Sequence, residues 1–278
     1  MKAEGVPVIR RARGFRLYDL QGRRFLDLYR DGGGALLGHR GGTTVTQMKS
    51  VLSQGLASGV ASVWEARLVR EIAAMFPGHA TVRLFSSRAR ALEAVSCSIG
   101  MRVDPSDLHD PALGAPPPAK PRATLWRPFL TDANGPPILD NAAWPAVLPV
   151  LPLTVCGAPA PVCFPSLPAS ELPDSDFVPG FVLAGAFAAL AALRRPGHAF
   201  SVSPMVSSAI DASPGWGRTG PYVYPTFRPE AYSRVFAEFL RAGVLLSPAY
   251  PGPSILPGDC SPGEARLLAR LFSSIPGG

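Results

Sequence analysis

Apolar and polar residues alternate in two short stretches near the start of the chain. They cover residues 15–19 and 24–28 and lie on either side of Gln21 and Gly22. Alternation with a period of two is typical of half-buried strands, and a glycine between two such strands favours a tight turn. The pattern therefore predicts a β-hairpin.

Helical spacing of apolar residues replaces this alternation further along. It predicts one helix around residues 45–52 and a second over residues 62–76. Ser62 followed three residues later by Glu65 indicates a capping box at the start of the second helix. Pro and Gly at positions 77 and 78 are expected to end it.

A strand, a small polar turn and a helix are predicted next. The strand covers residues 81–85, Ser86 and Ser87 form the turn, and the helix runs from residue 88 to 99. Backbone N–H groups at the start of such a helix point toward an anion. The turn is therefore the first candidate binding site in the chain.

The middle of the chain, residues 103–176, is rich in loops. Its segment 111–121 carries so many prolines, each without an N–H, that it is expected to be a stiff connector. Residues 124–130 and 146–155 are predicted to be strands bounded by prolines. An apolar helix is expected over residues 178–193.

The C-terminal part combines helices with a strand. Apolar residues recur at helical spacing from residue 232 to 240, and residues 244–248 read as a strand. Ser261 and Glu264 form a capping box that opens a last helix. This order of elements predicts a small α+β lobe.

Composition narrows the class of protein. The 278 residues are 47% hydrophobic and only 17% charged, with 28 Gly and 32 Pro, which fits packed elements joined by many turns. No apolar run approaches the roughly 20 residues of a membrane span, and the first seven residues show no secretory signal. We therefore expect a cytoplasmic protein without a membrane partner.

The basic charge is carried almost entirely by arginine. The formal net charge is +7, and the lysines are Lys2, Lys49 and Lys120. The densest arginine cluster, residues 10–16, lacks the alternating aromatic side chains of a nucleic-acid groove, so no nucleic-acid partner is expected. The four cysteines are widely spaced, which indicates neither a zinc site nor a disulfide framework.

Three ordered segments resemble the class III pyridoxal-phosphate-dependent aminotransferases. Residues 14–27 read GFRLYDLQGRRFLD, similar to the family's G-x-x-L-x-D-x-D-G-x-x-Y-L-D, and Gly38 with His39 matches its Gly-His pair. Residues 82–91, VRLFSSRARA, stand where the family has V-R-F-x-N-S-G-T-E-A. Residues 236–272 are similar to its C-terminal lobe, and glutamate-1-semialdehyde aminomutase is the nearest branch.

The resemblance implies an α/β protein with a reduced fold-type-I large domain and a small C-terminal α+β lobe. We expect residues 1–40 to form a hairpin segment that joins the small lobe. Residues 41–200 would form the shortened large domain, with the proline-rich connector at 103–122, and residues 201–278 the small lobe. The resemblance also implies pyridoxal phosphate as cofactor, with Ser86, Ser87 and Arg88 as the residues that bind it, and a homodimer.

The sequence departs from the family where the chemistry takes place. No lysine follows residue 120, although the family's Schiff-base lysine lies well downstream. The aspartate that pairs with the pyridine nitrogen has only Asp140 as a lookalike, and the stacking aromatic pair has no counterpart. Arg88 and Ala89 replace the Gly-Thr pair of the phosphate turn. We therefore predict no catalytic residue and possible loss of the cofactor itself.

The leading hypothesis is a degenerate aminotransferase-like protein with a binding, regulatory or scaffolding role. The alternative is an active aminotransferase or aminomutase acting on an amino acid or amino-aldehyde, which binds the cofactor non-covalently or uses Lys120 or Lys49. A third hypothesis is a heterodimer with a full-length homologue, with a contact face near Trp216 and Tyr222.

Two acidic segments have simpler interpretations. Residues 104–110 hold three aspartates and His109, a set that a divalent metal can use, but the spacing fits a solvated loop better and we predict no metal site. Asp174 and Asp176 precede the apolar helix and are expected to cap it.

Overall fold

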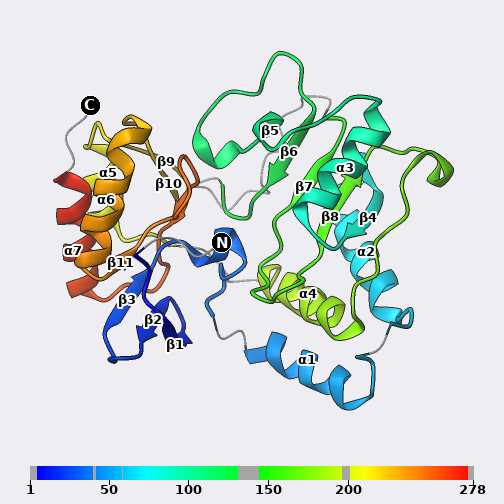
Figure 1. The fold of residues 1–278 in the computed structure, drawn as a ribbon, viewed down its shortest axis with the longest axis horizontal. Coiled ribbons are helices and arrows are strands. Elements are labelled where there is room, and N and C mark those ends of the chain that lie inside the picture. The colour runs from blue at the N-terminus through cyan, green and yellow to red at the C-terminus, as the bar shows by residue number, and fades with distance from the viewer. Residues whose placement is uncertain (1–4, 40–41, 58, 131–143, 196–200, 275–278) are drawn as a thin grey trace.

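The computed structural model places the chain in two groups of elements that lie side by side (Figure 1). It describes residues 5–39, 42–57, 59–130, 144–195 and 201–274. One group is built on a five-stranded sheet, and the other on two smaller sheets packed against the C-terminal helices. The α/β class expected from the sequence is confirmed. The division of the chain at residues 40 and 200 stays a prediction.

The five-stranded sheet is mixed and has the order β4-β8-β7-β6-β5. Only the β5–β6 and β6–β7 pairs are parallel. The strands are β4 (Thr81–Phe85), β5 (Leu108–His109), β6 (Ala123–Trp126), β7 (Val147–Pro149) and β8 (Ala160–Phe164). Every residue of β6 and β7 and all of β8 except Ala160 are buried, as expected for inner strands of a sheet covered on both faces.

Helices cover both faces of this sheet. Leu68 of α2 and Leu183 of α4 pack against Val82 and Val147 on one face, whereas Val95 of α3 belongs to a separate core on the opposite face. The fourth helix, α1, packs against α4. The helices are α1 (Gly42–Ser53), α2 (Val63–Met75), α3 (Arg88–Ile99) and α4 (Gly180–Leu193). The result is a three-layer sandwich.

The second group joins the two ends of the chain. The strands β1 (Ile9–Arg13), β2 (Arg16–Asp19), β3 (Arg24–Asp27) and β11 (Val244–Leu245) form one sheet, in which β3 and β11 run parallel. A second sheet has the order β12-β10-β9, with β9 (Trp216–Thr219), β10 (Tyr222–Pro225) and β12 (Ser254–Ile255). Leu26 and Leu28 share a core with Phe239 and Phe272, so N-terminal residues complete the C-terminal lobe.

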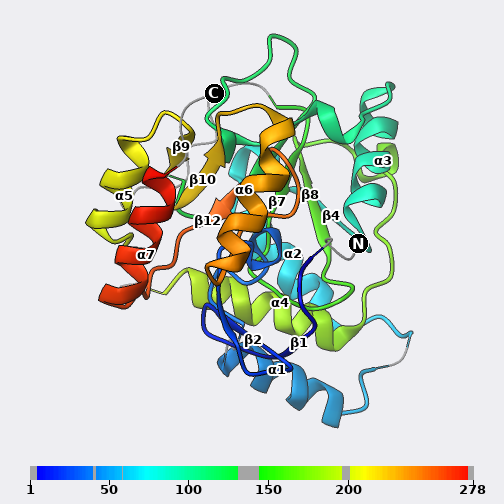
Figure 2. The same ribbon diagram turned by 60° about the vertical axis from the view of Figure 1, so that its left-hand side comes forward.

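Three helices pack together on this lobe (Figure 2). They are α5 (Pro204–Asp211), α6 (Pro229–Arg241) and α7 (Pro262–Ser273). At the start of α7 the side chains and backbone N–H groups of Ser261 and Glu264 bond reciprocally, which confirms the predicted capping box. The predicted hairpin and the helices near residues 45, 62, 88 and 232 are confirmed as well.

Other sequence predictions were wrong in detail. The side chain of Ser62 forms no cap hydrogen bond, so α2 has no capping box. The expected strands at 124–130 and 146–155 shorten to β6 and β7. The strand β8, the helix α5 and the β9–β10 hairpin were not predicted. Asp174 and Asp176 do not cap α4, because that helix begins at Gly180 after Pro179 and has no side-chain cap.

Candidate functional site

The turn between β4 and α3 is occupied by hydrogen bonds from within the chain. Ser86 donates to Oδ2 of Asp176 from its backbone nitrogen, at 3.0 Å, and from its hydroxyl, at 2.7 Å. Arg90 donates from Nη2 to Oδ1 of the same carboxylate at 3.2 Å. The Ser87 hydroxyl caps α3 by accepting from the Arg90 backbone nitrogen at 3.3 Å. An internal carboxylate thus lies where the sequence predicted an external anion.

These contacts favour the charged form of Asp176. The hydrogen bonds from the Ser86 hydroxyl and backbone, followed by those from Arg90, lower the pKa of the carboxyl to about 2. The Asp176 backbone nitrogen also donates to the Leu84 carbonyl at 2.8 Å, and the Leu84 nitrogen donates to the Ser175 hydroxyl at 3.1 Å. The segment before α4 is therefore held along β4.

Arg88, the third predicted site residue, differs from its neighbours. Its side chain is exposed and donates no hydrogen bond within the described ranges. Desolvation by the surrounding protein, and then repulsion from Arg127, lower the pKa of its guanidinium. Asp110 and Tyr29 act in the opposite direction. Arg88 is therefore an exposed cation that Arg127 repels and that Asp110 and Tyr29 stabilise in its charged form.

Arg127, whose charge repels that of Arg88, contacts three other segments of the chain. It forms a bidentate ion pair with Asp110 and donates to the Gly32 carbonyl at 2.9 Å. Its guanidinium also lies 5.5 Å from the ring centroid of Tyr222, a favourable cation–π distance. Arg127 is nearly fully buried, and so is Tyr222, whose hydroxyl donates to the Pro128 carbonyl at 2.8 Å.

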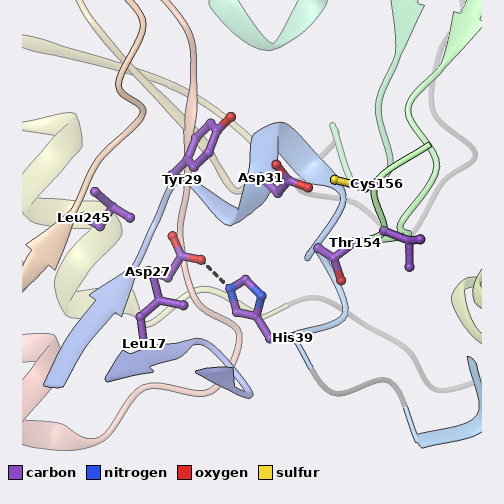
Figure 3. A pocket seen from close by; sticks show the side chains of 9 residues that line it. Leu17, Asp27, Tyr29, Asp31, His39, Thr154, Cys156 and Leu245 are labelled. Carbon is purple, nitrogen blue, oxygen red and sulfur yellow. Dashed lines mark hydrogen bonds and ion pairs between the residues drawn. The ribbon is translucent and has the colours of Figure 1, made fainter. Parts of the chain in front are cut away.

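A pocket of about 320 Å³ opens between the N-terminal sheet and the β7–β8 loop (Figure 3). On one side His39 Nε2 lies 2.6 Å from Asp27 Oδ2, and Asp27 Oδ1 accepts from the Arg30 nitrogen at 2.9 Å. Desolvation, followed by the charges of Asp31 and Asp27, raises the pKa of Tyr29. The lining residues are Leu17, Asp27, Tyr29, Asp31, His39, Thr154, Val155, Cys156 and Leu245.

The structure places neither described lysine at the α3 turn. Lys49 lies on α1, which packs against α4, and Lys120 lies exposed in the connector. Lys2 and Asp140 lie outside the described residues. The hydrogen-bond donors described around Ser86 are therefore hydroxyl, backbone amide and guanidinium groups, and not a lysine amine.

The acidic segment 104–110 is explained by internal contacts. Asp104 and Asp107 form a capping box around a short 3₁₀ turn, and Asp107 also pairs with Arg122 at 2.7 Å. Asp110 pairs with Arg127. Among the residues described here, no cluster of three or more His, Cys, Asp or Glu side chains is placed to hold a metal ion.

The expected contact face near Trp216 and Tyr222 was wrong. Trp216 is only 5% exposed and Tyr222 is fully buried, so neither ring can meet a partner chain. Trp216 packs edge-on against Phe227 and Phe272 in the core of the C-terminal lobe. The segment around residue 216 forms the β9–β10 hairpin, in which Trp216 and Tyr222 are buried and Gly217, Arg218 and Thr219 are half-buried.

Comparison with known proteins identifies a relative that covers most of the chain. No protein-family model matches the chain. An uncharacterized protein from Treponema pallidum (strain Nichols) is 30% identical over 296 aligned residues, which cover 90% of this chain and 88% of the relative. The chain belongs to the same family as this treponemal protein.

The fold of this chain is that of the class III aminotransferases. The β-phenylalanine aminotransferase from Variovorax paradoxus superposes with a TM-score of 0.73 at 13% identity, covering 99% of this chain and 88% of the enzyme. Glutamate-1-semialdehyde 2,1-aminomutase from Syntrophus aciditrophicus (strain SB) is 34% identical over 89 residues, 32% of this chain but only 21% of the enzyme. The resemblance found in the sequence is confirmed.

The class III fold implies pyridoxal phosphate, and the residues of this chain do not fit that group as the motif requires. The sequence has no lysine after residue 120 to form the covalent link. Both Ser86 donors are already bonded to Asp176, and Arg88 stands in place of the glycine that lets a phosphate approach the backbone.

Within the described ranges, no helix is long and apolar enough to cross a bilayer.

Proposed function

We propose that this protein is a non-catalytic member of the aminotransferase fold with a binding, regulatory or scaffolding role in the cytoplasm. The observation that carries the proposal is the absence of lysine from residues 121–278, together with the positions of Lys49 and Lys120 away from the α3 turn. Covalent pyridoxal-phosphate chemistry requires a lysine amine within reach of the cofactor aldehyde.

The scaffolding role would act through a dimer. We propose a homodimer, or a heterodimer with a full-length, lysine-bearing homologue. Apolar side chains that are more than one third exposed on α1 and near the start of α2 support this proposal. They are Val45, Leu52, Val60 and Val63. Size-exclusion chromatography with light scattering would distinguish a monomer from either dimer.

A second candidate function is an enzyme that binds pyridoxal phosphate without a covalent bond. Arg88 favours this candidate, because its accessible guanidinium has no hydrogen-bond partner among the described residues and would neutralise a phosphate. Ser86, Ser87 and Arg88 would then hold the cofactor. A transaminase assay with amino-acid and amino-aldehyde substrates tests for this activity.

An absorption spectrum tests for a covalent link between pyridoxal phosphate and a lysine, and the transaminase assay tests the non-covalent candidate. Purified protein is scanned for an aldimine band with and without added pyridoxal phosphate, then treated with borohydride and analysed by mass spectrometry. We expect no band that survives dialysis and no modified lysine. Lys49→Ala and Lys120→Ala are matched controls, since a band lost in either variant identifies the lysine used. Turnover abolished by borohydride would contradict the proposed function.

A further inference from the structure

We propose that the carboxylate of Asp176 is an internal anion that closes the turn Ser86–Ser87–Arg88 to phosphate groups. The inference rests on the proposed non-catalytic function and counts against the second candidate, in which a phosphate-bearing cofactor would enter at this turn. It adds a reason why the turn does not bind such a ligand, namely that the anion position is filled by the chain itself.

The donors of the turn are already committed to Asp176. Ser86 places both its backbone N–H and its hydroxyl on Oδ2, while Arg90 reaches Oδ1. Hydrogen bonds to an ionised acceptor are about twice as strong as neutral ones. A phosphate at this position would have to break these bonds and would also lie against a second negative charge.

The carboxylate is held there by its own backbone. The Asp176 nitrogen donates to the Leu84 carbonyl at 2.8 Å, and the adjacent Ser175 hydroxyl accepts from the Leu84 nitrogen at 3.1 Å. Two residues further on, Val178 is buried in the core between α2, α4 and the sheet. Asp176 is therefore fixed on both sides, and withdrawing it requires the strand-like contact with β4 to break.

Charge balance points to the same conclusion. Arg90 pairs with Glu93 as well as with Asp176, so its charge is neutralised within the chain. At the start of α3, the Arg88 guanidinium has no hydrogen-bond partner among the described residues. Removing the Asp176 carboxylate would free two donors on Ser86 and one on Arg90 beside that cation, which is the donor set that a phosphate needs.

Binding of inorganic phosphate to the full chain tests the inference. Isothermal titration at constant ionic strength compares the wild type with Asp176→Ala and with Asp174→Ala. Asp174 is exposed, belongs to the same segment and has no side-chain hydrogen bond among the described residues. We expect Asp176→Ala to bind phosphate at least about tenfold more tightly than the wild type, and Asp174→Ala to match the wild type.

Two further variants make the outcome decisive. Asp176→Asn keeps the side-chain shape and removes the charge, so it carries the test if Asp176→Ala fails to fold, and it should also bind more tightly than the wild type. Adding Ser86→Ala to Asp176→Ala should abolish the gain, which places the phosphate at the turn. Equal affinity in wild type and both Asp176 variants overturns the inference. So does an equal gain in Asp174→Ala, which would reflect net charge alone.

The result is independent of the test for catalysis. An aldimine band or turnover in the wild type contradicts the proposed function whatever the phosphate affinities are. Tight phosphate binding by the wild type, without aldimine or turnover, contradicts the closed turn and leaves the proposed function intact.

Discussion

Arg127 and Asp110 form a bidentate ion pair, with 2.8 Å between Nε and Oδ1 and 2.7 Å between Nη2 and Oδ2. The side chain of Arg127 is 5% exposed and that of Asp110 is 11% exposed. Burial alone would lower the pKa of Arg127, but Asp110 reverses the effect and raises it. Because Arg127 also bonds to the Gly32 carbonyl, the pair connects the sheet, the connector and the N-terminal segment.

Removing Asp110 should destabilise the protein strongly. Asp110→Ala leaves a buried guanidinium without its counter-ion, and we expect the free energy of unfolding to fall by about 3–5 kcal/mol. Urea denaturation followed by circular dichroism measures the loss. The double variant Asp110→Ala with Arg127→Met should recover part of it, because the buried charge is then gone. A loss below about 1 kcal/mol in the single variant contradicts this role.

Glu264 should make stability depend on acid pH. Its carboxyl accepts from Arg16 Nε at 2.8 Å and Nη2 at 2.7 Å, and the Arg16 hydrogen bond is the main cause that lowers its pKa to about 2. A carboxyl whose pKa is lower in the folded state stabilises the protein above its unfolded pKa, here near 4.5, and loses that contribution as the pH falls toward 2.

Glu264→Gln should therefore cost about 1–3 kcal/mol at pH 7, with a difference from wild type that shrinks steadily below pH 4.5. The neighbouring Asp259 is the control, because it meets the same arginine at 3.5 Å with a side chain that is 78% exposed. Asp259→Asn should change the free energy of unfolding by less than about 0.5 kcal/mol, both at pH 7 and below pH 4.5. A Glu264→Gln difference that stays constant with pH would refute the assignment.

Local patterns in the sequence predicted the elements whose hydrophobic spacing is continuous. The strand β4, the turn at Ser86 and the helix α3 are adjacent in the chain, so alternation followed by helical spacing was enough to find them. The strand β8 escaped prediction because Pro161 lies inside it, opposite Leu84 of β4, and proline normally argues against an inner strand.

The partners of the candidate site could not be predicted in the same way. Asp176 is 90 residues from Ser86, and its local context, just before an apolar helix, favoured a cap instead. Only the packing of the segment along β4 brings the carboxylate to the turn. The Arg127–Asp110 pair likewise depends on the parallel pairing of β5 with β6, because each residue directly follows one of these two strands. No local periodicity encodes that pairing.

His39 and Asp27 should be energetically coupled. Asp27 is almost fully buried and bonds both to His39 and to the Arg30 backbone nitrogen. His39→Ala removes one of the two hydrogen-bond partners that the described residues give this buried carboxylate, so we expect a loss of about 1–3 kcal/mol in unfolding free energy. A double-mutant cycle with Asp27→Ala should give a coupling of at least about 0.5 kcal/mol. Asp31→Ala combined with His39→Ala is the control and should be additive, because the Asp31 carboxylate in the same pocket has no hydrogen bond among the described residues. Strict additivity of His39→Ala with Asp27→Ala would contradict the coupling.

Gly220, in the β9–β10 turn, should be harder to replace than Gly22. It has a φ of +57°, and a Cβ there would lie 2.3 Å from the Phe129 carbonyl oxygen, a backbone atom that cannot rotate away. Gly22, in the β2–β3 turn, has a φ of +81° but open space around its Cβ position. Gly22→Ala therefore pays only the left-handed backbone cost of about 1–2 kcal/mol, whereas Gly220→Ala adds a clash worth at least about 1–3 kcal/mol. Parallel urea denaturation of both variants measures the difference, and equal losses would show that the loop at Phe129 moves aside.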